Sequence, residues 1–163
     1  MRKLLLLACI LAAACRQEGG NQVNRTAGPA EIAPDPVMVQ TTTLTGLYES
    51  RGNPPSQLCI TERGNAARFG LVTREGGGPG CSGAGTVVRA GSILRLTMAG
   101  DSACTIEARI ESGRVTFPAS LPQGCAYYCR PGARTAGLLL AKTGGTREEA
   151  LRARDIVGDS LCA

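Results

Sequence analysis

The sequence contains no histidine and no tryptophan, and it has only three Tyr and two Phe among its 163 residues. Without histidine the chain lacks the commonest general base and the commonest metal ligand of proteins. Because aromatic side chains are so few, the core has to be built mainly from Val, Ile, Leu and Ala. The 22 glycines raise the entropy cost of folding, so a domain of this composition benefits from covalent cross-links.

Long runs of like charge are also missing. Arg2 and Lys3 account for two of the 18 basic residues, which leaves 16 against 13 acidic ones, scattered singly along the chain. Proteins that bind nucleic acid cluster their basic residues and intersperse them with aromatic ones. We therefore expect no nucleic-acid partner. The length leaves room for one domain.

The first fifteen residues have the pattern of an export signal. A short basic start, Met1-Arg2-Lys3, precedes an apolar stretch over 4–14 that is too short to span a bilayer. Small residues, Ala12-Ala13-Ala14, stand directly before Cys15. This arrangement resembles the lipobox of bacterial lipoproteins. The resemblance implies cleavage before Cys15, attachment of diacylglycerol to its sulfur, and an N-terminal lipid anchor in a membrane.

Two alternatives to this cleavage site remain open. The lipobox usually has Leu three residues before the cysteine, where this chain has Ala12. Leu6-Leu7-Ala8 before Cys9 fits that pattern better, but leaves an apolar stretch of only four residues. The other alternative is a plain secretory signal that is cut after Ala13 or Ala14. Among lipoproteins, Asp after the lipidated cysteine favours retention in the inner membrane, so Arg16 implies the outer membrane.

The remaining cysteines support an exported, lipidated chain. Loss of Cys9 with the leader and lipidation of Cys15 leave an even set, which in an exported domain indicates three disulfides. A plain secretory signal would leave a seventh, unpaired thiol. Of the fifteen pairings that six cysteines allow, we expect Cys59–Cys81, Cys104–Cys125 and Cys129–Cys162. The six are Cys59, Cys81, Cys104, Cys125, Cys129 and Cys162.

The composition changes near residue 44. The stretch before it is polar and rich in Pro and Gly, with no apolar periodicity, so it is expected to be a disordered tether. A structured N-terminal extension is the alternative. The sequence therefore divides into a signal peptide (1–14), a lipidated Cys15 with its tether (15–43), and a disulfide-stapled β domain (44–163).

Short stretches of alternating or β-branched residues recur after residue 44. Within 104–111, Cys104, Ile106 and Ile110 alternate with charged residues, and Ser112-Gly113 then supplies a two-residue turn. Successive strands with tight turns predict a mainly β fold, a small antiparallel meander that forms a barrel or a sandwich. Strands are expected at about 45–50, 56–62, 66–73, 85–90, 92–98, 104–111 and 114–118.

One short helix is expected near the C-terminus. Thr146 and Glu149 have the spacing of a capping box. Glu148 and Arg152 have the spacing of an ion pair between residues one helical turn apart. The pattern predicts a helix at about 147–157, with Ala150, Ala153 and Val157 on one face, Gly158 ending it and Cys162 attaching it to the barrel. The segment 131–143 is consistent with either a strand or a helix.

Two glycine-containing motifs are more typical of structure than of chemistry. The stretch 78–83 matches G-x-G-x-x-G, but a strand rather than a helix is expected after it, so we interpret it as a glycine loop that holds a disulfide. Ser82 partly matches a nucleophile elbow, yet no histidine exists to accept its proton. Serine–lysine chemistry would need Lys142. We expect no catalytic residue, no cofactor and no metal site.

Cys125-Ala126-Tyr127-Tyr128-Cys129 is the most distinctive local sequence. Its C-x₃-C spacing is not the C-x₂-C of redox and zinc sites, so disulfides are favoured over a metal. Tyr and Arg often dominate binding interfaces, which makes Tyr127, Tyr128 and Arg130 the candidate binding residues. In an extended stretch neighbouring side chains alternate, so one tyrosine is expected to be exposed and the other packed inward. The alternative is that both tyrosines only cover the core.

The predicted meander with Cys59 and Cys81, over residues 45–118, is similar in architecture to small periplasmic β-barrel inhibitors of metalloproteases and of lysozyme. Tyr48 stands where such inhibitors commonly have a tryptophan in the first strand. The resemblance implies a non-catalytic binding or inhibitor module in the cell envelope, with an envelope protein or a glycan as partner. A structural lipoprotein without a discrete ligand is the alternative, and an enzyme is the third.

Overall fold

The computed structural model describes residues 43–163 apart from 76, 77, 134 and 136. Cys9, Cys15 and the tether up to residue 42 lie outside the described residues, so the predictions made for them stay predictions. No helix in the described part of the chain is long and apolar enough to cross a membrane.

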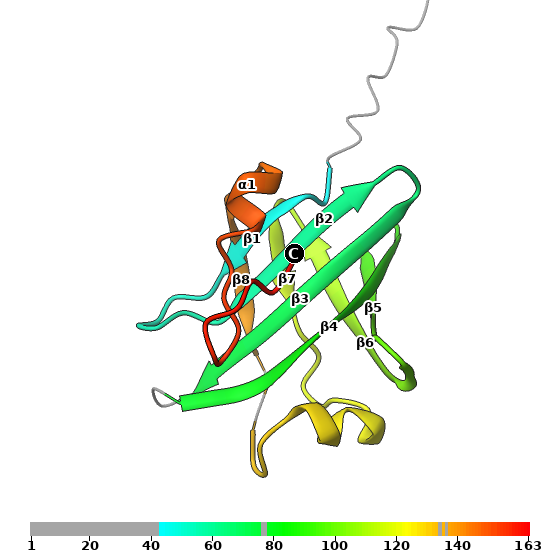
Figure 1. Cartoon of the computed structure of the whole chain (residues 1–163). Helices are drawn as coiled ribbons and strands as arrows, with labels where there is room; N and C mark the ends of the chain where they lie inside the picture. Colours follow the sequence, from blue (N-terminus) through cyan, green and yellow to red (C-terminus); the bar gives the residue numbers. More distant parts are fainter. Residues whose placement is uncertain (1–42, 76–77, 134, 136) are drawn as a thin grey trace, which may run out of the picture. The chain divides into compact units, whose positions relative to one another are not determined.

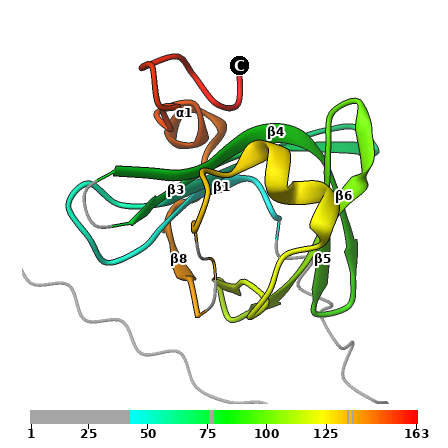
Figure 2. The same cartoon turned by 90° about the horizontal axis from the view of Figure 1, so that it is seen from below.

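Eight antiparallel strands form a closed barrel in the order of the sequence, and the last strand pairs with the first (Figures 1 and 2). This confirms the predicted β meander and decides between barrel and sandwich. The strands are β1 (Gly46–Glu49), β2 (Gln57–Arg63), β3 (Ala66–Glu75), β4 (Gly78–Ala90), β5 (Ile93–Met98), β6 (Asp101–Glu111), β7 (Arg114–Thr116) and β8 (Leu139–Gly144). A 3₁₀ helix, η1 (Gln123–Tyr128), lies between β7 and β8, and a short helix, α1 (Arg147–Ala150), follows β8.

The barrel interior is filled by apolar side chains. Along β6, Cys104, Ile106, Ala108 and Ile110 are buried and alternate with exposed or half-buried residues, as predicted. The Ser112-Gly113 turn has positive φ at both positions, 47° and 74°, as a type I′ hairpin requires. The largest fully buried side chains of the interior cluster are Tyr48, Phe69, Leu58, Ile60, Leu71, Leu94, Leu96, Ile106 and Leu140.

The glycine-rich stretch 78–83 lies in β4 and is not the loop that the sequence predicted. Two of its glycines allow neighbouring groups to come close: a Cβ on Gly80 would lie 2.5 Å from Thr73 Oγ1, and one on Gly83 would lie 2.7 Å from Met98 Sδ. β4 therefore begins seven residues before the predicted strand. The segment 131–143, left open between strand and helix, contributes β8 from residue 139 onward.

The C-terminal helix is shorter than predicted. The capping box forms as expected, with Thr146 accepting from the Glu149 amide and Glu149 accepting from the Thr146 amide, but α1 ends at Ala150. The predicted ion pair between Glu148 and Arg152 is not among the salt bridges of the described residues. Beyond α1 the backbone makes tertiary pairs in place of helical ones, since Arg154 pairs with Ser160 and the Leu161 amide donates to Ala153.

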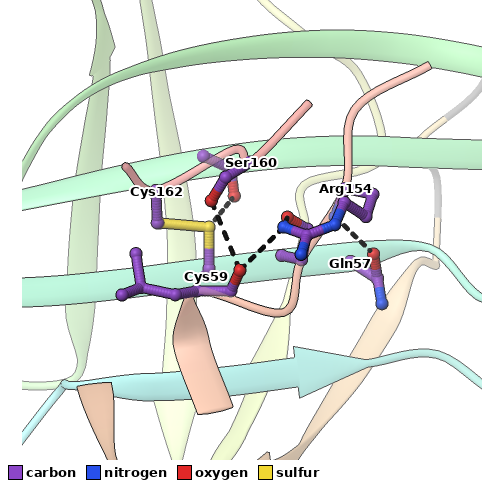
Figure 3. Close-up of a disulfide and its surroundings, with 8 residues drawn as sticks. Gln57, Cys59, Arg154, Ser160 and Cys162 are labelled. Carbon is purple, nitrogen blue, oxygen red and sulfur yellow. Dashed lines mark hydrogen bonds between the residues drawn. A yellow bond between two sulfur atoms is a disulfide. The ribbon is translucent and has the colours of Figure 1, made fainter. Parts of the chain in front are cut away.

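The C-terminal segment is held against the outside of β2. Cys162 forms a disulfide with Cys59 of β2, as the predicted attachment of this segment to the barrel required (Figure 3). The Arg154 amide donates to Gln57 Oε1 at 3.2 Å, and the Ser160 hydroxyl donates to the Leu151 carbonyl at 3.3 Å. Leu47, Cys59, Ala150, Ala153 and Cys162 form a second apolar cluster outside the barrel interior.

Three disulfides form, but two of the predicted pairings are wrong. Cys104–Cys125 is confirmed, whereas Cys59 bonds to Cys162 and Cys81 to Cys129. The predicted Cys59–Cys81 bond is excluded because β3 lies between β2 and β4. Strands two places apart are about 10 Å from each other, beyond the reach of a disulfide.

The two ends of the barrel differ. The Thr43 end comprises the start of β1, the β2–β3, β4–β5 and β6–β7 hairpins and the end of β8. The η1 end comprises the β1–β2 and β5–β6 connections, the end of β3, the start of β4 and the described residues of 117–138 (Figure 1). A polar cluster fixes the Thr43 end, where Glu62 accepts hydrogen bonds from Thr43 and Thr45, and the Lys142 ammonium donates to the Thr43 carbonyl at 3.0 Å.

Candidate functional site

The candidate binding residues lie in and beside η1, at the η1 end of the barrel (Figure 2). Pro122 precedes the helix and accepts from the Cys125 amide, and the Cys129 amide donates to the Ala126 carbonyl at its end. Gly124 allows η1 to press against β6, because a Cβ there would lie 2.5 Å from the Ala103 carbonyl oxygen. The η1 segment therefore covers this end of the barrel in close contact.

Two disulfides hold η1, one from inside the helix and one from the residue directly after it. Cys125 is bonded to Cys104 of β6 and Cys129 to Cys81 of β4. The next residue continues the attachment to β4, since the Arg130 amide donates to the Gly80 carbonyl at 2.8 Å. Side chains on such a segment are held in place before any partner arrives, so contact with them costs little ordering entropy.

Tyr127 and Tyr128 have different surroundings. Tyr127 is 89% exposed, whereas Tyr128 is half-buried and packs against the interior cluster. The predicted asymmetry is thus confirmed, but the reason given for it was wrong, because the two residues lie in a 3₁₀ helix and not in an extended stretch. The rings meet edge to face with centroids 5.4 Å apart.

The surroundings of Tyr128 raise the pKa of its hydroxyl. Burial raises the pKa of Tyr128 first, and the nearby Asp101 carboxylate and Tyr127 raise it further. Tyr128 is thus a neutral hydrogen-bonding group that also supports the exposed ring of Tyr127. An exposed aromatic ring supported in this way is suited to stacking and to apolar contact.

Two clefts flank the segment Cys129–Pro131. The larger has a volume of about 830 Å³, and its lining includes Leu121, Ala126 and Thr135. The smaller, of about 410 Å³, is lined by Tyr127, Tyr128, Ser82 and Ile156, among others. Cys129, Arg130 and Pro131 belong to both linings and so form the ridge between the clefts.

The ridge presents one cation, the side chain of Arg130. A hydroxyl without a hydrogen-bond partner in the described part of the chain, that of Thr135, lies in the larger cleft beside it. The Arg130 side chain is exposed and makes no hydrogen bond or ion pair with another described residue. In the larger cleft, Thr135 is only 4% exposed, and its hydroxyl has no hydrogen-bond partner among the described residues. A buried hydroxyl without a partner is costly, so a ligand group that bonded to it would recover free energy.

Ile156 and Val157 are the residues of this region that the sequence did not indicate. They were assigned to a helix with Val157 on its buried face, but Ile156 is 54% and Val157 77% exposed. They lie in a loop in which Asp155 Oδ1 accepts from the amides of Val157 and Asp159. An Asp followed three residues later by Gly158 is a turn signal that could have predicted this loop.

The serine–lysine pair considered from the sequence does not form. Ser82 borders the smaller cleft at the η1 end, whereas Lys142 lies at the Thr43 end, so the structure does not bring these two residues together. Within the described residues, no group of three or more Cys, Asp or Glu side chains is placed to hold a metal ion.

Comparison with known proteins finds no match. This holds for models of protein families, for curated proteins and for solved structures alike.

Proposed function

We propose that this chain is a lipid-anchored module of the bacterial cell envelope that binds a partner through the η1 end of its barrel. The observation that carries the proposal is the exposed ring of Tyr127 beside the ridge of Cys129, Arg130 and Pro131, which separates two clefts on a segment held by two disulfides. A rigid aromatic residue next to a cation is the combination that most often dominates protein interfaces. An envelope protein is the favoured partner, and a glycan that stacks on Tyr127 is the other.

The absence of chemical groups in reacting positions favours binding over catalysis as the role of this site. Ser82 and Ser120 are the serine side chains that line the two clefts among the described residues, and neither forms a hydrogen bond with a basic side chain in the described part of the chain. The interior of the barrel is filled by the apolar cluster and leaves no room for a partner. Binding at the ridge does not require the barrel to open. The partner is therefore expected to meet the outside of the η1 end.

The anchor is proposed to be attached at Cys15. Replacing Cys15 with Ala in a bacterial host is expected to abolish incorporation of labelled palmitate and to leave precursor or unanchored protein. Cys9→Ala is the matched control and is expected to be labelled normally. Labelling that persists in Cys15→Ala and disappears in Cys9→Ala would move the anchor to Cys9.

The binding site can be tested by photo-crosslinking in intact cells. A benzophenone amino acid at position 127 is expected to give a discrete crosslinked product, whereas the same probe at Val88, which is also an exposed apolar site but in β4, gives none. Sensitivity of the product to protease distinguishes a protein from a glycan. Equal products at both positions, or none at 127, would contradict the proposed site.

The two tyrosines are expected to separate binding from stability. Tyr127→Ala costs less than about 1 kcal/mol of unfolding free energy because the side chain is exposed. It is nevertheless expected to abolish binding of the partner that the crosslinking experiment identifies. Tyr128→Ala costs about 1–2 kcal/mol because part of its ring packs on the core. Thermal melts and partner retention measure both effects, and retention by Tyr127→Ala at the wild-type level counts against the ridge.

A further inference from the structure

The barrel carries unequal charge at its two ends. The Thr43 end presents basic side chains that come from its hairpins and the strands beside them, from β8 and from α1. At the η1 end, Asp101, Asp155 and Asp159 stand among the basic residues, which include Arg51 and Arg130. The basic residues of the Thr43 end are Arg63, Arg68, Arg89, Arg114, Lys142 and Arg147.

Among the described residues, the acidic side chains that stand against these six basic ones at the Thr43 end are Glu62, Glu111, Glu148 and Glu149. Glu62 accepts from Thr43 and Thr45, and Glu111 lies 3.3 Å from Arg109. Glu149 accepts from the amides of Gly145 and Thr146. Glu148 is exposed on α1, but the excess of basic side chains remains.

Three of the guanidinium groups converge on one groove. Arg63 from β2, Arg68 from β3 and Arg147 from α1 line a groove of about 610 Å³ on the outside of the barrel. Glu62 is the acidic side chain among the residues that line it, so three guanidinium groups stand against one side-chain carboxylate. None of these three side chains makes a hydrogen bond or an ion pair within the described part of the chain. Guanidinium groups left without partners are suited to phosphate, which they bind through paired N–H donors.

We propose that the Thr43 end docks on an anionic phospholipid surface, with headgroup phosphate bound in the groove of Arg63, Arg68 and Arg147. This inference rests on the proposed lipid anchor, because the described chain begins at this end, at Thr43. An anchored barrel in this orientation holds its basic end toward the bilayer and its η1 end away from it. Basic residues close to an anionic bilayer are attracted by its surface potential within about a Debye length.

Arginine footprinting on the anchored chain tests the orientation. The purified lipidated protein is reconstituted in phosphatidylcholine vesicles with or without about one third phosphatidylglycerol, treated with phenylglyoxal, and examined by peptide mass spectrometry. In anionic vesicles, labelling of Arg63, Arg114 and Arg147 is expected to fall about three-fold or more, and to recover in about 0.5 M salt. Arg51 and Arg130 serve as internal controls at the η1 end and keep their labelling rates.

Variants and soluble phosphate identify the ligand. Charge reversal by Arg63→Glu with Arg147→Glu is expected to remove the protection of Arg114, whereas Arg51→Glu leaves that protection unchanged. Arg51, Arg63 and Arg147 are all exposed, so these variants are expected to fold like the wild type. Protection by soluble glycerol phosphate in neutral vesicles would overturn the membrane as the source of the ligand. Labelling that is equal with and without anionic lipid, or protection of Arg51 and Arg130, would overturn the docking itself.

The anchor and the docking surface can fail separately. Flotation of the chain with neutral vesicles tests the anchor alone. If the chain does not float, the anchor proposal is wrong, and the same labelling of chain mixed with anionic vesicles still decides whether the basic end binds lipid.

Discussion

Removal of the Cys59–Cys162 disulfide is expected to lower the free energy of unfolding by about 4–5 kcal/mol. The bond spans 103 residues, the longest separation of the three, and so restricts the unfolded chain most. It also attaches the C-terminal segment to β2, and the cluster of Leu47, Ala150 and Ala153 depends on that attachment. Urea denaturation of the double variant Cys59→Ala and Cys162→Ala measures the loss.

The other two disulfides provide the comparison. Cys81–Cys129 spans 48 residues and Cys104–Cys125 spans 21, for which loop closure gives about 4 and about 3 kcal/mol. Each pair is replaced with Ala in the same way. A smaller loss for Cys59–Cys162 than for Cys104–Cys125 contradicts the loop-length argument. Titration of thiols in the denatured, unreduced wild type checks that all six cysteines are oxidised, and two or more free thiols among them would show an incomplete set of bonds.

Gly85→Ala is expected to destabilise the barrel by about 3 kcal/mol or more. Gly85 lies in β4 opposite Met98 of β5, where the register with β6 shifts. A Cβ at this position would lie 2.0 Å from the Thr97 carbonyl oxygen and 2.9 Å from Met98 Cα. Both are backbone atoms of a paired strand, so neither can move without disturbing the β4–β5 ladder.

Gly145→Ala is the matched control. Gly145 lies between β8 and α1, and a Cβ there meets nothing within 4 Å. The same change of one methyl group is therefore expected to shift the free energy of unfolding by less than about 0.5 kcal/mol. Thermal or urea melts of the two variants make the comparison, and equal losses would show that contact at Gly85 is not the cause.

Local sequence patterns were sufficient to predict β1 to β7, apart from the start of β4, but they left β8 open between strand and helix. The alternation along β6, and the Ser112-Gly113 turn after it, follow from which side chains must be buried and which residues tolerate positive φ. These constraints act between neighbours in the sequence. The capping box of Thr146 and Glu149 was predictable for the same reason, since both partners lie within one turn.

Features set by distant contacts were not predictable. The end of α1 depends on the pairing of Arg154 with Ser160 and on the Cys59–Cys162 bond, and the latter joins residues 103 apart. The disulfide pairing depends on which strands are neighbours, because β3 separates Cys59 from Cys81. At the candidate site, Tyr127 and Arg130 were indicated by residue type, whereas Ile156 joins them only through the folded chain.

The order of the cysteines has a consequence for biogenesis. In a chain exported N-terminus first, Cys59 emerges before all its possible partners in the domain, and Cys81 is the first to follow it. An oxidase that joins thiols as they emerge would make a bond between these two, which the barrel cannot contain. Cys59 finds its native partner only in Cys162, 103 residues later. If the chain is exported as proposed, its maturation would call for thiol–disulfide exchange, and a cell without a disulfide isomerase would accumulate the misbonded form.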